Sequence, residues 1–441
     1  MKKQTLWVAI VLMMGTAMNG CSSDNNDEPE ATPTEQPADA PADDEEEEEA
    51  DDLIYDVDYI QLSKKQRDLV SGNNSFAFRL LQQTRAEGDN AGKNLILSPL
   101  SITYALGMLN NGAAGETQQQ ISQMLGFGDT GLDDINAFCR KMLDEAPRLD
   151  PETKVRIANT IYMNQPYELL PAFVETARTC YEAEPETRNF HDGRTMDVIN
   201  QWASDHTKGM IKKVLDENSF NPDAVSYLLN ATYFKGTWTE KFDTADTRDE
   251  AFSGYNKSLQ QVPMMHMEDT LRYAEDDLCQ ALTMTYGRGL YQMTVLLPRE
   301  GKTLEDVEQG LEARWRGYSY GNEAIVDVKL PRFEANTDVN LKEVMSKLGM
   351  PLAFDMNLAE FPYFCNIPTY IGLMKQVARI KVNEQGSEAA AVTVIAMDGT
   401  AAPGPEPALP HYVFHADRPF LYVISEQSSR AIFFVGQYVG E

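Results

Sequence analysis

Acidic residues are concentrated in one short part of this chain, and that distribution limits which part can fold. Between Cys21 and Asp58 there are 17 Asp and Glu residues and no Lys or Arg. Like charges at this density repel one another, and too few apolar side chains are present to form a core. We therefore expect residues 21–58 to be a disordered acidic tether. A cation-binding acidic run is the alternative.

From Tyr59 onward the chain has the composition of a folded protein. The tether carries about half of the formal net charge of −30, and hydrophobic residues make up 42% of the 441 residues. That share is enough for a large core. A net acidic chain lacks the basic surface that displaces counterions from nucleic acids. We expect one folded domain over residues 59–441 and no nucleic-acid partner.

Residues 1–20 resemble a bacterial lipoprotein signal peptide. Lys2 and Lys3 precede an apolar segment, Leu6 to Met14, that is too short to span a bilayer. The Gly20-Cys21 pair matches the junction where such peptides are removed and the cysteine receives a lipid. Ordinary secretion with cleavage nearby is the alternative.

The residues behind Cys21 suggest where the protein is exported. Three acidic residues follow Cys21 closely: Asp24, Asp27 and Glu28. They resemble the surface-export signals of some Bacteroidetes lipoproteins. We expect a protein that is lipid-anchored at the outer membrane through Cys21, at the cell surface, and that contacts the membrane only through this anchor.

The folded part mixes helical and strand patterns. Ser98 is a plausible N-cap, with Pro99 at the first helical position. The predicted helices cover residues 76–85, 99–109, 116–125, 198–207 and 341–348, and the predicted strands cover 94–97, 155–163, 227–234, 291–297, 325–330, 377–382, 419–425 and 431–438. No strand–helix rhythm repeats, so the pattern predicts an α+β fold.

Motifs for enzymatic chemistry are weak. His411 and His415 share one face of a predicted strand, but no third ligand is visible, so we expect no metal and no cofactor. Gly317 to Gly321 matches a nucleophile elbow around Ser319, but a helical stretch precedes it and a strand follows. This order is the reverse of a true elbow. We therefore expect that the protein is not an enzyme. The alternative hypothesis, a hydrolase, would depend on Ser319 alone.

The remaining cysteines, Cys139, Cys180, Cys279 and Cys365, show no CxxC spacing. Zinc-ribbon and redox functions therefore have no support.

Residues 384–397 have an unusual composition. Gly386 offers a pivot, small residues follow from Ser387 to Ala391, and β-branched residues come next. A Pro-rich stretch continues to Pro410. An alternating strand precedes this segment, so we expect an exposed loop that can also become a strand.

Together with other motifs, this segment makes the chain resemble the serpin family over about residues 65–441. Five separated motifs carry the resemblance in the right order: residues 94–102, 230–238, 328–333 with 341–354, 382–393, and 417–420 with 432–436. The resemblance implies three β-sheets surrounded by eight or nine helices, with an exposed reactive loop at about residues 384–418.

The family resemblance also implies a mechanism. A protease cleaves the loop and forms an acyl-enzyme, and the loop then inserts into the central sheet and traps the protease. The resemblance thus predicts a suicide inhibitor of serine endopeptidases, with cysteine endopeptidases as further candidates. We expect a monomer that forms a covalent complex with its target protease.

The hinge of the loop has side chains that suit insertion. The expected hinge residues are Glu384, Gly386, Ser387, Glu388, Ala389, Ala390, Ala391 and Thr393. Alternation places Ser387, Ala389 and Ala391 on the face that becomes buried and leaves Glu388 toward solvent. Small buried residues favour rapid insertion and hence inhibition.

The family's usual spacing from Glu384 places the scissile bond between Thr400 and Ala401. The loop is longer than usual on its C-terminal side, so Met397–Asp398 and Ala401–Ala402 are alternatives. Residues 382–417 contain no Lys or Arg. The predicted targets are therefore elastase-like or subtilisin-like proteases, not trypsin-like ones.

Other residues match structural positions of the family. Those in the sheet-opening region are Ser98, Ser101, Asn230, Trp238, Arg332 and Gln376. Gln376 stands where the family usually has a titratable His. Arg332 and Glu384 are expected to form an exposed, weak ion pair. Residues 131–147 are not basic, so we expect no heparin binding.

A non-inhibitory serpin that serves as a surface binding protein is the competing function. The small hinge residues favour the inhibitor.

Overall fold

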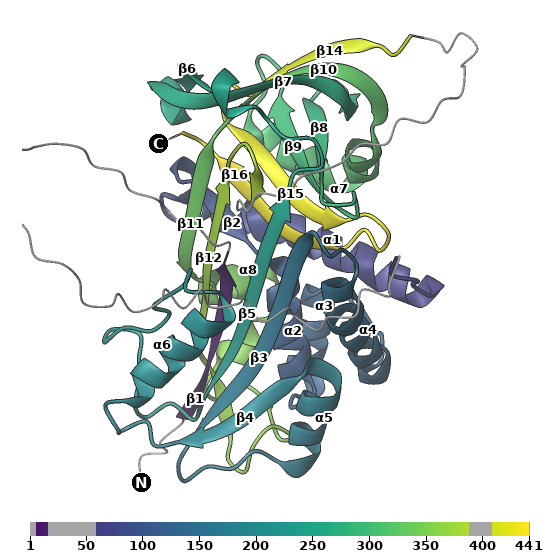
Figure 1. The fold of residues 1–441 in the computed structure, drawn as a ribbon. Helices are drawn as coiled ribbons and strands as arrows, with labels where there is room; N and C mark the ends of the chain where they lie inside the picture. Colours follow the sequence, from purple (N-terminus) through teal and green to yellow (C-terminus); the bar gives the residue numbers. More distant parts are fainter. Residues whose placement is uncertain (1–5, 16–58, 388–407, 441) are drawn as a thin grey trace, which may run out of the picture.

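The computed structural model describes the backbone of residues 6–15 and the complete residues 59–387 and 408–440. These parts form eight α-helices and three β-sheets, which confirms the α+β class expected from the sequence (Figure 1). Most of the acidic tether, including Cys21, lies outside the described residues, and so does the central part of the predicted loop, 388–407.

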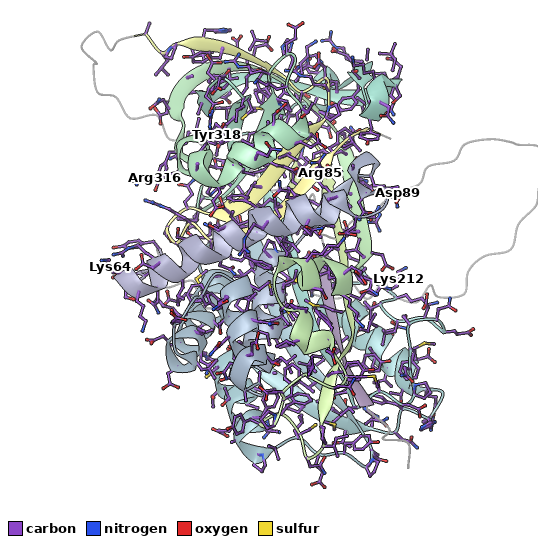
Figure 2. The ribbon with its side chains drawn as sticks, turned by 180° about the vertical axis from the view of Figure 1, so that it is seen from behind. Lys64, Arg85, Asp89, Lys212, Arg316 and Tyr318 are labelled. Carbon is purple, nitrogen blue, oxygen red and sulfur yellow. The ribbon has the colours of Figure 1, made fainter. Side chains whose placement is uncertain are left out.

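The helices surround the sheets, and the longest, α1, crosses the face of the molecule that is turned to the reader in Figure 2. Their bounds are α1 Lys64–Ala86, α2 Pro99–Asn110, α3 Gly115–Met124, α4 Leu132–Glu145, α5 Pro171–Tyr181, α6 Thr195–His206, α7 Leu304–Tyr320 and α8 Lys342–Leu348. A capping box starts α1, because the Ser63 hydroxyl accepts from the Gln66 amide and the Gln66 side chain accepts from the Ser63 amide.

The central sheet runs along the front of the molecule in Figure 1. Its strands, in spatial order, are β11 Phe333–Asn340, β12 Thr369–Val382, β1 Leu6–Gly15, β5 Ser226–Thr237, β3 Thr153–Asn164 and β4 Ala183–Arg188, and the short β13 Gly386–Ser387 pairs with the end of β5. In this sheet β5 and β12 are parallel to β1 and antiparallel to β3 and β11 respectively.

The other strands form one hydrogen-bonded network that is folded into two sheets. In order they are β14 His411–His415, β10 Asn322–Pro331, β7 Leu259–Glu275, β8 Cys279–Tyr286, β9 Tyr291–Pro298, β15 Phe420–Glu426, β16 Ile432–Tyr438 and β2 Leu95–Leu97, with β6 Arg248–Ser253 beside β7. The long β7 belongs to both sheets, because most of it pairs with β10 whereas its last residues pair with β8.

Strand β1 is the main difference from the sequence-based expectation. Its residues, Leu6–Gly15, contain the apolar segment assigned to a signal peptide, and the structure places them in the middle of the central sheet. The segment's strong apolar and β-branched composition suits a buried strand as well as it suits a signal peptide. Removal of residues 1–20 from the mature protein stays a prediction.

Helix α2 joins the core of the molecule to the central sheet. As predicted, Ser98 is its N-cap, accepting a hydrogen bond from the Ser101 amide, and Pro99 is its first residue. All twelve residues of α2 are buried. The helix contacts both β5 and β16, so it links two sheets through one apolar core.

Helix α1 approaches the turn after α3 closely enough to require glycine. A Cβ atom on Gly72 would lie 1.9 Å from the carbonyl oxygen of Gly126, and Gly126 has a φ of +82°. No side chain fits between two backbones at this distance. The contact fixes α1 against the segment that follows α3.

We predict that Gly72→Ala destabilises the fold by about 2 kcal/mol, because the backbones must separate and overpacking outweighs the better helix propensity of alanine. The midpoint of urea unfolding measures this. The matched control is Gly317→Ala in α7, where a Cβ atom meets nothing within 4 Å. Equal midpoints for Gly72→Ala and the wild type would contradict the close contact.

Candidate functional site at the top of the central sheet

The predicted hinge folds as a tight turn that leads from β12 into β13. The Asn383 amide donates to the Gly386 carbonyl (3.0 Å), and the Gly386 amide donates back to the Asn383 carbonyl (3.1 Å). Gly386 has a φ of +137°, and a Cβ atom there would lie 2.2 Å from the Gly236 carbonyl oxygen. Glycine is therefore required at the point where the chain turns onto β5.

Trp238 holds this turn in place. Its indole Nε1 donates to the Asn383 carbonyl and its backbone amide donates to the Gln385 carbonyl, both at 2.9 Å. The indole stacks on the ring of Tyr286 with centroids 4.3 Å apart. The sequence predicted Trp238 for this region, and the structure brings it into direct contact with the hinge.

Tyr286 is a site residue that the sequence analysis missed. Its hydroxyl lies 2.8 Å from the Ser387 hydroxyl, and both side chains are fully buried. Burial raises the pKa of Tyr286 well above its usual value, so the phenol is neutral and can donate. Tyr286 comes from β8, outside every hinge motif, so no local pattern identifies it.

The Glu384–Arg332 pair corrects one expectation. The two side chains form the predicted ion pair, but Glu384 is buried, with a side chain only 4% exposed, rather than exposed as expected. Thr247 donates a second hydrogen bond to the same carboxylate oxygen at 2.6 Å. Burial alone would raise the pKa of Glu384, but the hydrogen bonds from Arg332 and Thr247 outweigh it and lower the pKa.

Glu384 therefore anchors the hinge more firmly than a surface ion pair could. Its backbone carbonyl also accepts from the Phe242 amide at 3.1 Å. A buried carboxylate that loses its partners is costly, whereas exposed pairs contribute little. The sequence spacing predicted the partner but not the burial, because burial depends on the segment around Thr247.

The sheet-opening residues form two polar contacts under the sheet. Gln376 on β12 exchanges hydrogen bonds with the backbone of Ser98, at 3.3 and 3.1 Å. The Ser101 hydroxyl lies 2.5 Å from that of Thr232 on β5. The side chains involved are fully or almost fully buried. Because α2 reaches both β5 and β12, these contacts tie the two strands to one helix.

The second contact extends along the sheet. Thr232 donates to Asn230 at 3.1 Å, and Asn230 donates to Asn159 on β3 at 2.8 Å. Asn159 and Thr232 were not predicted as site residues, although Thr232 lies in the motif around Asn230. Asn159 carries no signal of its own in the sequence.

Between β5 and β12, strand β1 occupies the place that an inserted loop would need. Ser387 pairs with Gly236, so an antiparallel continuation of β13 would pair residues 390–397 with Tyr233 to Ser226 of β5. In the structure β1 pairs with those same residues of β5. One strand position cannot hold both segments.

The central part of the loop lies outside the described residues. This applies to the hinge residues Glu388, Ala389, Ala390, Ala391 and Thr393 and to every candidate scissile residue: Met397, Asp398, Thr400, Ala401 and Ala402. The described chain resumes before β14, which pairs with β10. The loop thus leaves from the top of the central sheet and ends at the edge of a different sheet.

The residues of the weak enzymatic motifs form hydrogen bonds with other residues of the fold. The Nε2 atoms of His411 and His415 lie 3.1 Å from two different carboxylates, those of Glu268 and Asp327. The residues that the structure describes contain no group of three or more potential metal ligands.

Ser319 lies in the last turn of α7, and its hydroxyl donates to the Arg316 carbonyl. A helix precedes it and β10 follows, as the sequence predicted, so it is not a nucleophile elbow.

Residues 131–147, where the sequence predicts no heparin site, contain the whole of α4. Arg140 and Lys141 are paired with Glu182 and Glu145. The four cysteines beyond Cys21 are free thiols. Within the described residues, no helix has the length and apolar character needed to cross a bilayer.

Comparison with known proteins identifies the family. The family model described as "Serpin (serine protease inhibitor)" matches residues 71–440. Serpin B8 of Homo sapiens is 32% identical over 382 residues, covering 84% of this chain and 99% of its own length. Serpin B6 of Macaca fascicularis is 30% identical over 381 residues, covering 84% and 98%.

A solved structure agrees with the sequence relatives. The thermophilic serpin tengpin, in its native state, superposes with a TM-score of 0.75 at 26% identity, covering 87% of this chain and 96% of tengpin. The family-model match over residues 71–440 includes β5, β12, the hinge and the C-terminal strands described above. The chain therefore belongs to the serpin family, whose members are generally protease inhibitors rather than enzymes.

Proposed function

We propose that this serpin is a suicide inhibitor of serine endopeptidases, with cysteine endopeptidases as further candidates. A target protease cleaves the loop and forms an acyl-enzyme, and the loop then inserts between β5 and β12 before deacylation. The observation that carries the proposal is the hinge itself. Gly386 and Ser387 already pair with the end of β5, at the start of the path that an inserting strand would follow.

The side chains near the hinge suit that path. Ser387 is fully buried against Tyr286, so the residues in step with it, Ala389 and Ala391, would also point into the core. Both are small, and neither brings a charge to be desolvated. Glu388 would face solvent. Insertion would satisfy main-chain groups along β5 and β12 without overpacking the core.

Strand β1 bears directly on this mechanism. It holds the strand position that residues 390–397 would need, so insertion requires that β1 leave the sheet. Removal of residues 1–20 as a signal peptide would vacate the position. A chain that keeps β1 would behave as a non-inhibitory serpin, and this gives a specific basis to the second candidate function, a surface binding protein.

The sequence of the loop limits the targets. Residues 382–417 contain no Lys or Arg, so a protease that requires a basic residue before the cut has no site there. Small and apolar residues flank Thr400–Ala401, which we propose as the scissile bond, with Met397–Asp398 as the alternative. Elastase-like and subtilisin-like proteases accept such residues.

We place the protein outside the cell, anchored by lipid at Cys21, with the acidic tether holding the domain away from the membrane. The support comes from the sequence: the Lys2–Lys3 start, the short apolar segment and the Gly20-Cys21 junction. The family assignment does not depend on this proposal.

We predict that the chain from Ser22 onward forms an SDS-stable complex with an elastase-type protease and not with trypsin. Ala389→Arg should reduce the complex at least about tenfold while cleavage of the loop persists, because an unpaired charge would enter the core during insertion. Gel analysis of the products measures both outcomes.

The matched control is Glu388→Arg, which places the same side chain on the neighbouring, solvent-facing position. It should retain the complex. Equal complex formation by the Ala389→Arg variant and the wild type would contradict insertion along this register.

We also predict that residues 1–20 block inhibition. The chain that starts at Met1 should be cleaved in the loop without forming the complex, whereas the chain from Ser22 should form it, because β1 and the loop need the same position. The control is a chain from Met1 with Val8→Asp and Val11→Asp, which puts charges into a strand that lies between two others in the central sheet. Complex formation by all three chains in equal yield would contradict the competition.

We predict that Cys21→Ser moves the protein from the membrane fraction to the soluble fraction, because the thioether-linked lipid is lost. Covalent lipid contributes about 0.8 kcal/mol per buried methylene group, so its loss abolishes stable anchoring. The control is Cys180→Ser, which removes a partly exposed thiol from the folded domain. A Cys21→Ser variant that still fractionates entirely with membranes would overturn the anchor.

A further inference from the structure

Four arginines surround a groove that is unlike the rest of this acidic protein. A cavity of about 480 Å³ lies between α1, α7 and the turn that joins β15 to β16, and Arg67, Arg316 and Arg430 line it. Arg272 lines an adjoining pocket that shares Trp315, Tyr320 and Arg430 with the first. We call the two together the arginine groove. Figure 2 shows Arg316 on the same side of the molecule as Lys64, the first residue of α1.

These arginines are not neutralised within the described part of the chain. Arg67 donates to the Leu62 carbonyl, Arg272 donates to Gln427, and Arg430 lies 4.7 Å from the ring centroid of Tyr320. None of the four forms an ion pair with a carboxylate of the described residues. By contrast, Arg314 on the same α7 pairs with two aspartates.

The acidic residues of the groove offset only part of this charge. Glu312 and Glu426 are the acidic residues that line it. Glu426 is buried and already accepts hydrogen bonds from Ser428 and Ser429. The groove therefore keeps a net positive charge in a protein whose formal net charge is −30.

Aromatic side chains form part of the wall of the groove, beside serine and asparagine side chains. Phe78 of α1 and Trp315 of α7 pack edge to face with ring centroids 5.6 Å apart, and both line the cavity. Tyr320 is 42% exposed under the Arg430 side chain. Arginine at the rim with aromatic side chains below suits a ligand that carries carboxylates and apolar side chains together.

A segment of this chain with that composition ends beside the groove. The Ile60 amide donates to the Ser428 hydroxyl at 2.8 Å, and Ser428 lines the cavity. The residues just before this point are Asp51-Asp52-Leu53-Ile54-Tyr55-Asp56-Val57-Asp58. They comprise four aspartates and four apolar or aromatic residues. Fully extended, eight residues reach roughly 26 Å, enough to cross the groove from its edge.

We propose that residues 51–58 dock into the arginine groove, with their aspartates on the arginines and their apolar side chains against Phe78, Trp315 and Tyr320. Exposed ion pairs are individually weak. Here several act together, and the covalent link to Ile60 gives the segment a high effective concentration at the groove. The freely extended part of the tether would then end near residue 50, and the tether would leave the folded domain at a defined face.

Hydrogen exchange of the full chain with Cys21→Ser tests the proposal. Amides of residues 53–58 should exchange at least about tenfold more slowly than those of residues 31–42, and the difference should disappear near 0.5 M salt, where charges are screened. The double variant Arg316→Glu, Arg430→Glu should abolish the slow exchange. So should neutralising the four aspartates of residues 51–58 to asparagine, which leaves the folded domain unchanged.

Two control variants separate docking from general electrostatics. Arg178→Glu with Lys212→Glu makes the same change of charge at exposed positions on and near other helices, and neutralising Glu45 to Glu48 makes the same change in the tether. Both should keep the slow exchange. Equal exchange of 53–58 and 31–42 in the wild type, or loss of slow exchange in either control, would overturn the proposal. Slow exchange that depends on protein concentration would show that a second copy of the chain occupies the groove, and this result would also overturn the proposal.

Discussion

The facing edges of β5 and β12 are the constraint on which the rest of this structure depends. Each strand has a row of backbone amide and carbonyl groups directed toward the other, and buried groups of this kind need hydrogen-bond partners. In the structure β1 supplies them. In the proposed mechanism the cleaved loop supplies them instead. One strand position lies between the two edges, and the segment that fills it decides what the molecule can do.

The hinge is organised to deliver a strand to this place. Gly386 turns the chain onto β5 where no other residue fits, and Trp238, Tyr286 and Glu384 fix the turn through buried hydrogen bonds. The buried Glu384 carboxylate is more costly to leave unpaired than an exposed one, so its contacts with Arg332 and Thr247 hold the hinge in one position. The polar contacts at the start of α2 tie β5 and β12 to the same helix, so they restrain the separation of the two strands.

The distribution of charge is a second feature that the fold determines. The acidic tether precedes a domain that is itself acidic, yet the arginine groove lies where the tether joins that domain. Sequence alone separates the tether from the domain by composition. It does not reveal that Arg67, Arg272, Arg316 and Arg430 meet, because they come from two helices, one strand and one turn that are far apart in the chain.

The sequence by itself determined the local features of this protein. The N-cap at Ser98, the glycine at 386, the small residues that follow it and the lack of basic residues in the loop are properties of short segments, and each depends on neighbouring side chains or backbone preference. The family motifs also gave the fold class and the pairing of Glu384 with Arg332.

Only the tertiary structure decided which segments meet. The burial of Glu384, the contact of Tyr286 with Ser387, the network through Asn159 and the place of β1 between β5 and β12 all join residues that are distant in the chain. Such contacts depend on the packing of whole elements. An apolar segment such as Leu6–Gly15 suits either a signal peptide or a central strand, because its local pattern is the same in both. Its place in the sheet follows from the facing edges of β5 and β12, which are formed by distant parts of the chain.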